Sequence, residues 1–173
     1  MARHLCIHGH FYQPPREDPW QGDVLPEGSA APAHDWNERI HRESYAPLAW
    51  ARRLDANGRI ADIMNCYEWM SFNVGPTLLR WMDRHAPDTL RRMVEGDRQS
   101  LARWGHGNAL AQVYHHIIMP LATVRDREME VAWAVDDFMH RFGRKPEGMW
   151  LAESAADLPS LETLADAGIA ELQ

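Results

Sequence analysis

Residues 146–173 read PEGMWLAESAADLPSLETLADAGIAELQ, and this stretch predicts the class of fold. Its apolar run GMWLAE is typical of a short buried strand. A helix should follow, because Asp157 is a good N-cap, Pro159 suits a first helical turn and Gly168 ends the pattern. The segment IAELQ lies where another strand ought to begin. A strand, a helix and a second strand in succession are the repeating unit of parallel sheets.

The same alternation runs through the rest of the chain. Two further strands are expected at residues 4–8 (HLCIH) and 59–67 (RIADIMNCY). Helical patterns, separated by Asn-Gly, proline or glycine, cover residues 35–57 (with an interruption near Pro47), 76–86, 88–103 and 124–142. This order predicts an α/β protein with a mostly parallel sheet.

The composition is that of one globular domain. The chain has 173 residues, of which 45% are hydrophobic and 25% are charged. A parallel sheet needs both edges covered and a barrel must close, but the sequence stops where a strand begins. We therefore expect residues 1–173 to be the N-terminal part of something longer.

Charge and hydropathy narrow the class of partner. A net charge of −7 and the lack of a lysine/arginine cluster argue against a nucleic-acid partner, and favour a neutral or cationic small substrate. No segment has the length of a signal peptide core or of a membrane span, so we expect a cytoplasmic protein without a membrane partner. Cys6 and Cys66 lie in apolar stretches and are interpreted as buried thiols. The oligomeric state cannot be read from the sequence.

Two histidines mark the end of the first predicted strand. Side chains alternate along a strand, so His8 and His10 should share a face, at the carboxyl end where α/β barrels hold their active sites. They can equally be two partly exposed histidines beside a turn. An H-x-H pair also fits two metal ligands, for which a third would have to come from His106, His115 or His116.

Glu153 is the acid that stands out. It follows directly after the apolar run of residues 148–152, and it can be either a catalytic carboxylate or an ordinary surface acid. Trp150 favours function, because an indole beside a carboxylate can stack on a sugar or tune the acid's pKa. His115 and His116 are adjacent, so at most one of them can point into a given pocket.

Four segments taken together, HGHFYQPP, SFNVGPTLL, YHHIIMPLA and GMWLAE, resemble glycoside hydrolase family 57, and in particular its branch with the HGHFYQPPRE signature. The resemblance implies an incomplete seven-stranded (β/α) barrel and a retaining enzyme acting on α-glucans. It implies that Glu153 is the catalytic nucleophile. It further implies substrate contacts from five residues: His8, His10, Gln13, His116 and Trp150.

The resemblance also implies what must lie elsewhere. The family's general acid/base aspartate belongs to a later region, so residues 1–173 alone should be inactive; Asp157 is expected to be a helix cap instead. The implied substrate is an α-glucan or maltooligosaccharide, with either hydrolysis or transfer as the reaction and no cofactor. Two alternatives stay open: a noncatalytic carbohydrate-binding or regulatory protein, and a metal-dependent deacetylase-like barrel using His8, His10 and a carboxylate.

Overall fold

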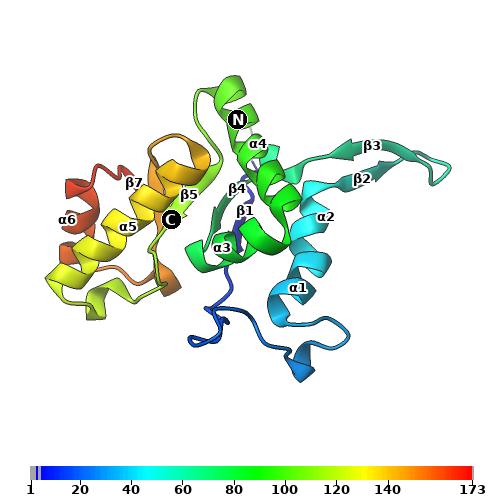
Figure 1. Cartoon of the computed structure of the whole chain (residues 1–173). Helices are drawn as coiled ribbons and strands as arrows, with labels where there is room; N and C mark the ends of the chain where they lie inside the picture. The colour runs from blue at the N-terminus through cyan, green and yellow to red at the C-terminus, as the bar shows by residue number, and fades with distance from the viewer. Residues whose placement is uncertain (1–2, 4, 173) are drawn as a thin grey trace.

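The centre of the molecule is a five-stranded sheet in which all neighbouring strands are parallel (Figure 1). The computed structural model describes residues 3 and 5–172. The strands follow the order β1 (His8–Phe11), β4 (Ser71–Val74), β5 (Ala109–Gln112), β6 (Gly148–Trp150) and β7 (Glu171–Leu172). Each strand therefore pairs with the preceding sheet strand of the chain, which is the order of neighbouring strands in an α/β barrel. The predicted α/β class with a parallel sheet is confirmed.

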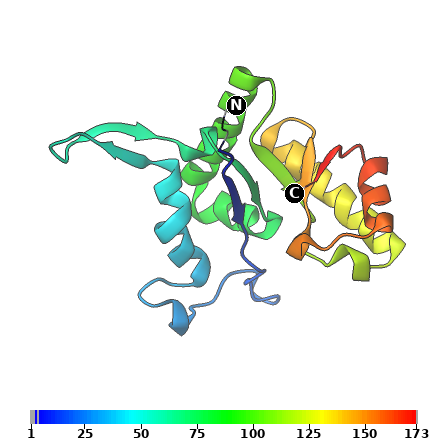
Figure 2. The ribbon, with the colours of Figure 1, turned by 180° about the vertical axis from the view of Figure 1, so that it is seen from behind.

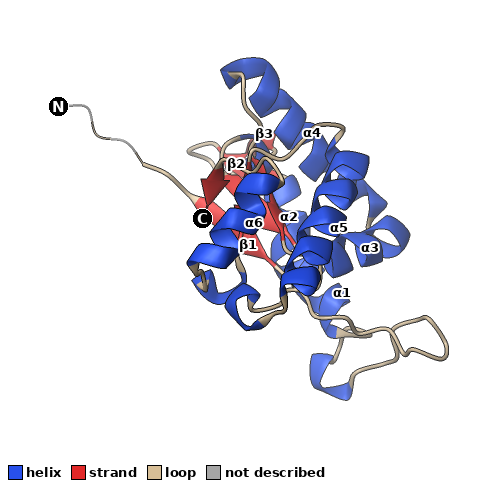
Figure 3. Ribbon diagram, turned by 90° about the vertical axis from the view of Figure 1, so that its left-hand side faces the viewer, coloured by secondary structure: helices blue, strands red, loops and turns tan. Residues whose placement is uncertain are grey.

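Four helices connect these strands: α3 (Pro76–His85), α4 (Pro87–Trp104), α5 (Val124–Phe142) and α6 (Leu158–Asp166). Figure 3 shows α3, α4 and α5 together on one side of the strands. The predicted end signals are in place. Asp157 accepts a hydrogen bond from the backbone of Ser160 as N-cap of α6, and Gly143 ends α5 in the left-handed conformation.

The hydrophobic core includes alternate residues of the strands and the inner faces of the helices. Phe72, Ala111 and Met149 are buried in one cluster with Leu78 of α3 and Met93 of α4. Because strand side chains alternate between faces, the residues between these apolar ones point the other way. That second face carries the polar side chains described below.

The chain between β1 and β4 departs from the prediction. The expected helix over residues 35–57 ends early and consists of α1 (Trp36–Ile40), a π-helical turn (His41–Tyr45) and α2 (Ala46–Ala49). An antiparallel hairpin of β2 (Ala51–Leu54) and β3 (Ile60–Met64) follows, and it projects from the body of the molecule (Figures 1 and 2). Asn57-Gly58, expected to end a helix, lies in the turn of this hairpin.

The strand expected at residues 59–67 is present as β3, but it pairs with β2 and does not belong to the main parallel sheet. Ile60 and Ile63 are each 53% exposed in the hairpin, so their apolar character does not mark burial. The second sheet strand is β4, and Gly75-Pro76 starts α3 directly after it. Short 3₁₀ turns complete the chain at Gly28–Ala30, Cys66–Glu68, Met119–Leu121 and Ala152–Ser154.

The first predicted strand is shifted. Pairing with β4 begins at His8 rather than before it, so Cys6 precedes the sheet and is exposed. The interpretation of Cys6 as a buried thiol is therefore wrong, whereas Cys66 is half-buried. His4 lies outside the described residues. Within the described part of the chain, no helix is long and apolar enough to cross a membrane.

Candidate active site

The parallel strands bring the predicted residues to one face of the sheet. His10 and Trp150 lie in the carboxyl halves of their strands, whereas His8 is the first residue of β1, so its expected place at the carboxyl end is wrong. His8 pairs in register with Ser71, His10 with Asn73, and Gln112 with Trp150. Since the strands are parallel and in register, the side chains that alternate with the apolar core residues meet on the opposite face. The result is a polar and aromatic surface built from four separate chain segments.

Four rings form what we call the aromatic cluster: His10, Tyr12, His116 and Trp150. His10 stacks on Trp150 with ring centroids 3.9 Å apart, and Tyr12 stacks on His116 at the same separation. The two pairs are joined, because the centroid of His116 lies 5.3 Å from Trp150 and 5.9 Å from His10. Flat, partly exposed rings beside hydrogen-bonding groups suit a ligand with apolar faces and polar edges, such as a sugar.

Buried amide side chains form hydrogen bonds with His8 and His10. Asn73 is fully buried, and its Oδ1 lies 3.0 Å from Nε2 of His8, while its Nδ2 lies 2.9 Å from Nδ1 of His10. The Nδ2 group of Asn73 also donates to Oε1 of Gln112 at 2.6 Å. On its other side, Nδ1 of His8 lies 2.9 Å from Oγ of Ser71. Both imidazoles are thus held in place by side chains of neighbouring strands.

Close approach of the backbone makes room for the cluster. A Cβ atom on Gly75 would come within 2.8 Å of the Tyr12 ring and 3.2 Å of Nε2 of Gln112. Glycine at the turn from β4 to α3 therefore lets Tyr12 lie across that turn and stack on His116. In this sense Gly75 belongs to the site although it carries no chemistry.

Glu153 lies in the 3₁₀ turn directly after β6, and its side chain is exposed. Its backbone has a φ of 56°, in the left-handed region that disfavours residues with a Cβ. Among the described residues other than glycine, positive φ occurs only at His116, Glu153 and Ser154. Such conformations each cost about 1–3 kcal/mol and gather at functional sites. Two of the three residues are candidates from the sequence.

The pKa of His10 depends on the groups that surround it at this edge of the sheet. Partial burial lowers the pKa of His10, and the imidazoles of His116 and His8 lower it further. The hydrogen bond to Asn73 and the carboxylate of Glu153 act in the opposite direction. Because the pKa lies below the usual value of about 6.5, the imidazole is neutral at pH 7. Burial also raises the pKa of the Tyr12 hydroxyl, which stays protonated.

Two candidate residues have other partners. Gln13 is buried, and its amide donates to the Tyr45 hydroxyl at 3.2 Å and accepts from Arg16 at 3.2 Å. These contacts tie Gln13 to the core rather than to the aromatic cluster. His115 bonds Glu130 through its Nδ1 at 2.6 Å, so His115 and His116 point to different neighbours, as expected for adjacent residues.

Sequence reasoning missed Asn73, Gln112 and Tyr12. A signal for the first was present, because alternation within SFNV puts Ser71 and Asn73 on one face, just as it does for His8 and His10. Gln112 at the end of ALAQ has the same character. Tyr12 had no such signal, since the residue follows the strand and its direction depends on the turn at Gly75.

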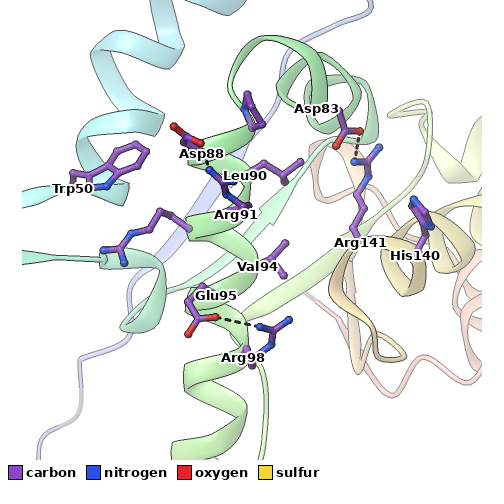
Figure 4. A pocket seen from close by; sticks show the side chains of 12 residues that line it. Trp50, Asp83, Asp88, Leu90, Arg91, Val94, Glu95, Arg98, His140 and Arg141 are labelled. Atoms are coloured by element: carbon purple, nitrogen blue, oxygen red, sulfur yellow. Dashed lines mark hydrogen bonds and ion pairs between the residues drawn. The ribbon is translucent and has the colours of Figure 1, made fainter.

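A groove of about 880 Å³ lies elsewhere, between α4 and residues of α3 and α5 (Figure 4). Two of its arginines are paired with acids, Arg141 with Asp83 at 2.6 Å and Arg98 with Glu95 at 3.3 Å, while Arg92 donates to the carbonyl of Ala49 at 3.1 Å. None of the residues that line this groove belongs to the aromatic cluster. In the described part of the chain, no group of three or more His, Cys, Asp or Glu side chains is arranged to hold a metal ion.

Comparison with known proteins identifies a family whose model matches most of the chain. The model of the family described as glycosyl hydrolase family 57 matches residues 30–172. The match begins after the HGHFYQPP segment, so it depends on the later motifs. No protein with a curated description matches the chain.

Solved structures share the fold. A 4-α-glucanotransferase from Thermococcus litoralis has a TM-score of 0.63 and 19% identity, over 96% of this chain and 22% of that chain. An exo-type maltose-forming amylase from Pyrococcus sp. ST04 has a TM-score of 0.63 and 16% identity, over 96% and 28%. An α-amylase from Thermotoga maritima has a TM-score of 0.61 and 12% identity, over 96% and 38%. The chain thus corresponds to between 22% and 38% of the length of these three structures.

Proposed function

The chain belongs to glycosyl hydrolase family 57, and on that premise we propose that it carries the nucleophile and a sugar subsite of an α-glucan-active retaining hydrolase or glucanotransferase. One observation carries the proposal most directly. Glu153 follows β6 in a left-handed conformation at the edge where His10, His116 and Trp150 stack. The names of the structural relatives, a glucanotransferase and two amylases, support the substrate class.

In this proposal the carboxylate of Glu153 attacks the anomeric carbon of a glucosyl unit. The carbon–oxygen bond to the leaving group breaks as the ester bond to Glu153 forms, and configuration at the carbon inverts. A water molecule or a sugar hydroxyl then displaces Glu153 with a second inversion, which gives net retention. Water as acceptor produces hydrolysis, and a sugar hydroxyl produces transfer.

The aromatic cluster has the chemistry of the subsite. The indole of Trp150 can cover the apolar face of a glucosyl ring, and the neutral imidazole of His10 and the ring of His116 can exchange hydrogen bonds with its hydroxyls. A neutral imidazole also avoids an ion pair with Glu153, which would weaken the carboxylate as a nucleophile. The lowered pKa of His10 fits this role.

Double displacement needs a second carboxyl group, about 5–5.5 Å from the first, as general acid and base. Glu153 is the carboxylate whose charge acts on His10. Asp157 is occupied as the cap of α6, through hydrogen bonds from Ser160. We propose that the acid/base aspartate comes from a segment after residue 173, and that residues 1–173 alone bind glucan without turning it over.

The test is Glu153→Gln in the natural protein that contains this chain, with Glu162→Gln as the matched control. Glutamine keeps the size of the side chain and removes the attacking charge, so turnover of an activated α-glucoside should fall by about a thousandfold or more. Glu162 is an exposed acid of α6, and its substitution should leave turnover unchanged. Added azide should restore turnover in Glu153→Gln and yield a glycosyl azide of inverted configuration.

If turnover of Glu153→Gln stays within about threefold of wild type, a barrier change on the order of 0.6 kcal/mol, then Glu153 is an ordinary surface acid and not the nucleophile. Maltooligosaccharide binding without any turnover by the unmodified natural protein would instead favour the noncatalytic carbohydrate-binding alternative. Both measurements compare proteins at equal folded fraction, which is checked by circular dichroism.

A further inference from the structure

We propose that Asn73 is a positioning residue whose amide holds His8 and His10 in the tautomers protonated on Nε2, so that His10 offers an N–H donor to the substrate. The role in substrate binding rests on the proposed function. The tautomer assignment does not, because it follows from contacts inside the folded chain.

The hydrogen-bonding capacity of one amide leads to this assignment. The Nδ2 group of Asn73 has two hydrogens and faces two acceptors, Oε1 of Gln112 at 2.6 Å and Nδ1 of His10 at 2.9 Å. A nitrogen that accepts a hydrogen bond carries no proton, so neutral His10 must be protonated on Nε2. The Oδ1 atom of Asn73 is an acceptor, and it faces Nε2 of His8 at 3.0 Å, so His8 is protonated on Nε2 as well.

The contact of His8 with Ser71 is consistent with this tautomer. With its proton on Nε2, His8 has a bare Nδ1, which can accept from the hydroxyl of Ser71 at 2.9 Å. Every polar atom of Asn73 and both ring nitrogens of His8 are then satisfied. For His10, Nε2 makes no hydrogen bond with any described residue, and its proton is available to a ligand at the exposed edge.

Two competing arrangements exist. In the first, the amides stay as they are and Nδ1 of His10 carries the proton and donates it to Oδ1 of Asn73, but this contact of 3.3 Å is longer than the 2.9 Å to Nδ2. The second requires that both amides be reversed. If the amides of Asn73 and Gln112 were both reversed, Oδ1 of Asn73 would face His10, and both histidines would carry their proton on Nδ1. His10 would then present a bare Nε2, an acceptor, to the substrate. In this second arrangement the two histidines change tautomer together through one amide, whereas in the first only His10 changes.

The groups that face His10 keep it neutral, which is the condition for this mechanism. Two of them, His8 and His116, are imidazoles that oppose a positive charge, while the carboxylate of Glu153 favours one. Trp150 covers one face of the ring and Asn73 occupies Nδ1. Burial outweighs the hydrogen bond with Asn73 and the attraction of Glu153, which both raise the pKa of His10, since the net shift of that pKa is downward.

The experiment is nitrogen NMR of the 173-residue chain with ¹⁵N-labelled histidine at pH 7.5, where a bare ring nitrogen resonates far downfield of a protonated one. His8→Gln and His10→Gln assign the signals. We expect both histidines to be protonated on Nε2 in the unmodified chain. Protonation of His10 on Nδ1, alone or together with His8, would overturn the assignment.

Asn73→Asp tests the cause. A carboxylate has no proton to donate, so His10 should become protonated on Nδ1, and its pKa should rise by about one unit or more. Asn65→Asp is the matched control: Asn65 is a buried amide that donates to the Arg92 carbonyl at 2.7 Å, away from the site. An unchanged His10 tautomer and pKa in Asn73→Asp would overturn the proposal, as would an equal change in Asn65→Asp.

Gln112→Met gives a second route should Asn73→Asp fail to fold. It removes the acceptor that orients the Nδ2 group of Asn73, so the reversed amide should become populated and both histidines should shift toward Nδ1 together. A titration with maltohexaose separates the two proposals. A shift of the His10 Nε2 signal on addition of maltohexaose supports the substrate contact. If both histidines have the expected tautomers but no signal responds to maltohexaose, the tautomer assignment stands, the substrate contact is overturned and the result counts against the proposed function.

Discussion

At the scale of the residue, the left-handed backbone of Glu153 is the feature with the clearest energetic meaning. A φ of 56° crowds the Cβ of any residue other than glycine, and glutamate has no local hydrogen bond that offsets this strain. His116, which stacks on Tyr12, has a φ of 58°. The fold therefore holds two strained residues at the edge where the aromatic cluster lies. Strain retained at a site for its function is a common trade of stability for activity.

Glu153→Gly should accordingly stabilise the chain while removing the proposed nucleophile. Glycine adopts positive φ without a steric penalty, so we expect the free energy of unfolding to rise by about 1 kcal/mol. The matched control is Glu162→Gly within α6, which should lower stability by about the same amount because glycine disfavours helix interiors. Denaturant unfolding of the three proteins provides the comparison. A lower stability for Glu153→Gly would show that the turn is not strained.

At the scale of the element, α4 is positioned by the absence of a side chain. Gly96 lies in the middle of this helix, where glycine ordinarily lowers stability. Here it faces the 3₁₀ turn of residues 66–68, and a Cβ would come within 2.7 Å of Cβ and 2.8 Å of the carbonyl carbon of Tyr67. Tyr67 is fully buried and its hydroxyl donates to the Tyr45 carbonyl, so it cannot move away freely. The contact lets α4 approach the turn that leads into β4.

We expect Gly96→Ala to destabilise the protein, against the usual direction for a helix. The gain in helix propensity is about 1 kcal/mol, whereas overpacking against a rigid backbone costs about 1–3 kcal/mol. Ala102→Gly, at an exposed position of the same helix, gives the propensity effect alone and should cost about 1 kcal/mol. Thermal unfolding of both variants decides the sign. A rise in melting temperature for Gly96→Ala would show that α4 does not lie so close to Tyr67.

At the scale of the whole molecule, one buried ion pair joins distant parts of the chain. Arg144, after α5, donates to both carboxylate oxygens of Asp97 in α4, at 2.9 and 2.8 Å, and to the carbonyl of Ala109 at 2.9 Å. Asp97 also accepts from the backbone N–H of Ala109 at 2.7 Å. Ala109 begins β5, so the pair stands at the amino ends of the strands, opposite the aromatic cluster. This division between stability and chemistry is typical of α/β barrels.

Asp97→Ala should therefore lower the free energy of unfolding by about 3–5 kcal/mol, because it leaves the guanidinium of Arg144 buried without a counter-charge. The exposed pair of Arg91 and Asp88 supplies the control, and Asp88→Ala should cost less than about 1 kcal/mol. Urea unfolding checks both values. Similar losses for the two variants would mean that the buried pair has no special structural role.

The sequence alone determined the features that depend on neighbours along the chain. Capping residues and glycines placed α5 and α6, because a helix end is a local matter of backbone hydrogen bonds. Alternation placed His8 and His10 on one face, and motif order brought Glu153, Trp150 and His116 into a single hypothesis. These predictions needed no knowledge of what packs where.

The tertiary structure decided the features that depend on partners far apart in sequence. Residues 60–64 have the composition of a buried sheet strand, but they form one strand of an exposed hairpin, because they pair with β2 rather than with the main sheet. Gln13 belongs to the HGHFYQPP segment yet binds Tyr45, whereas Asn73 contacts two histidines that lie more than sixty residues away in the sequence. Local sequence sets which conformations a segment favours; the register of the strands sets which side chains meet, and only the folded chain contains that register.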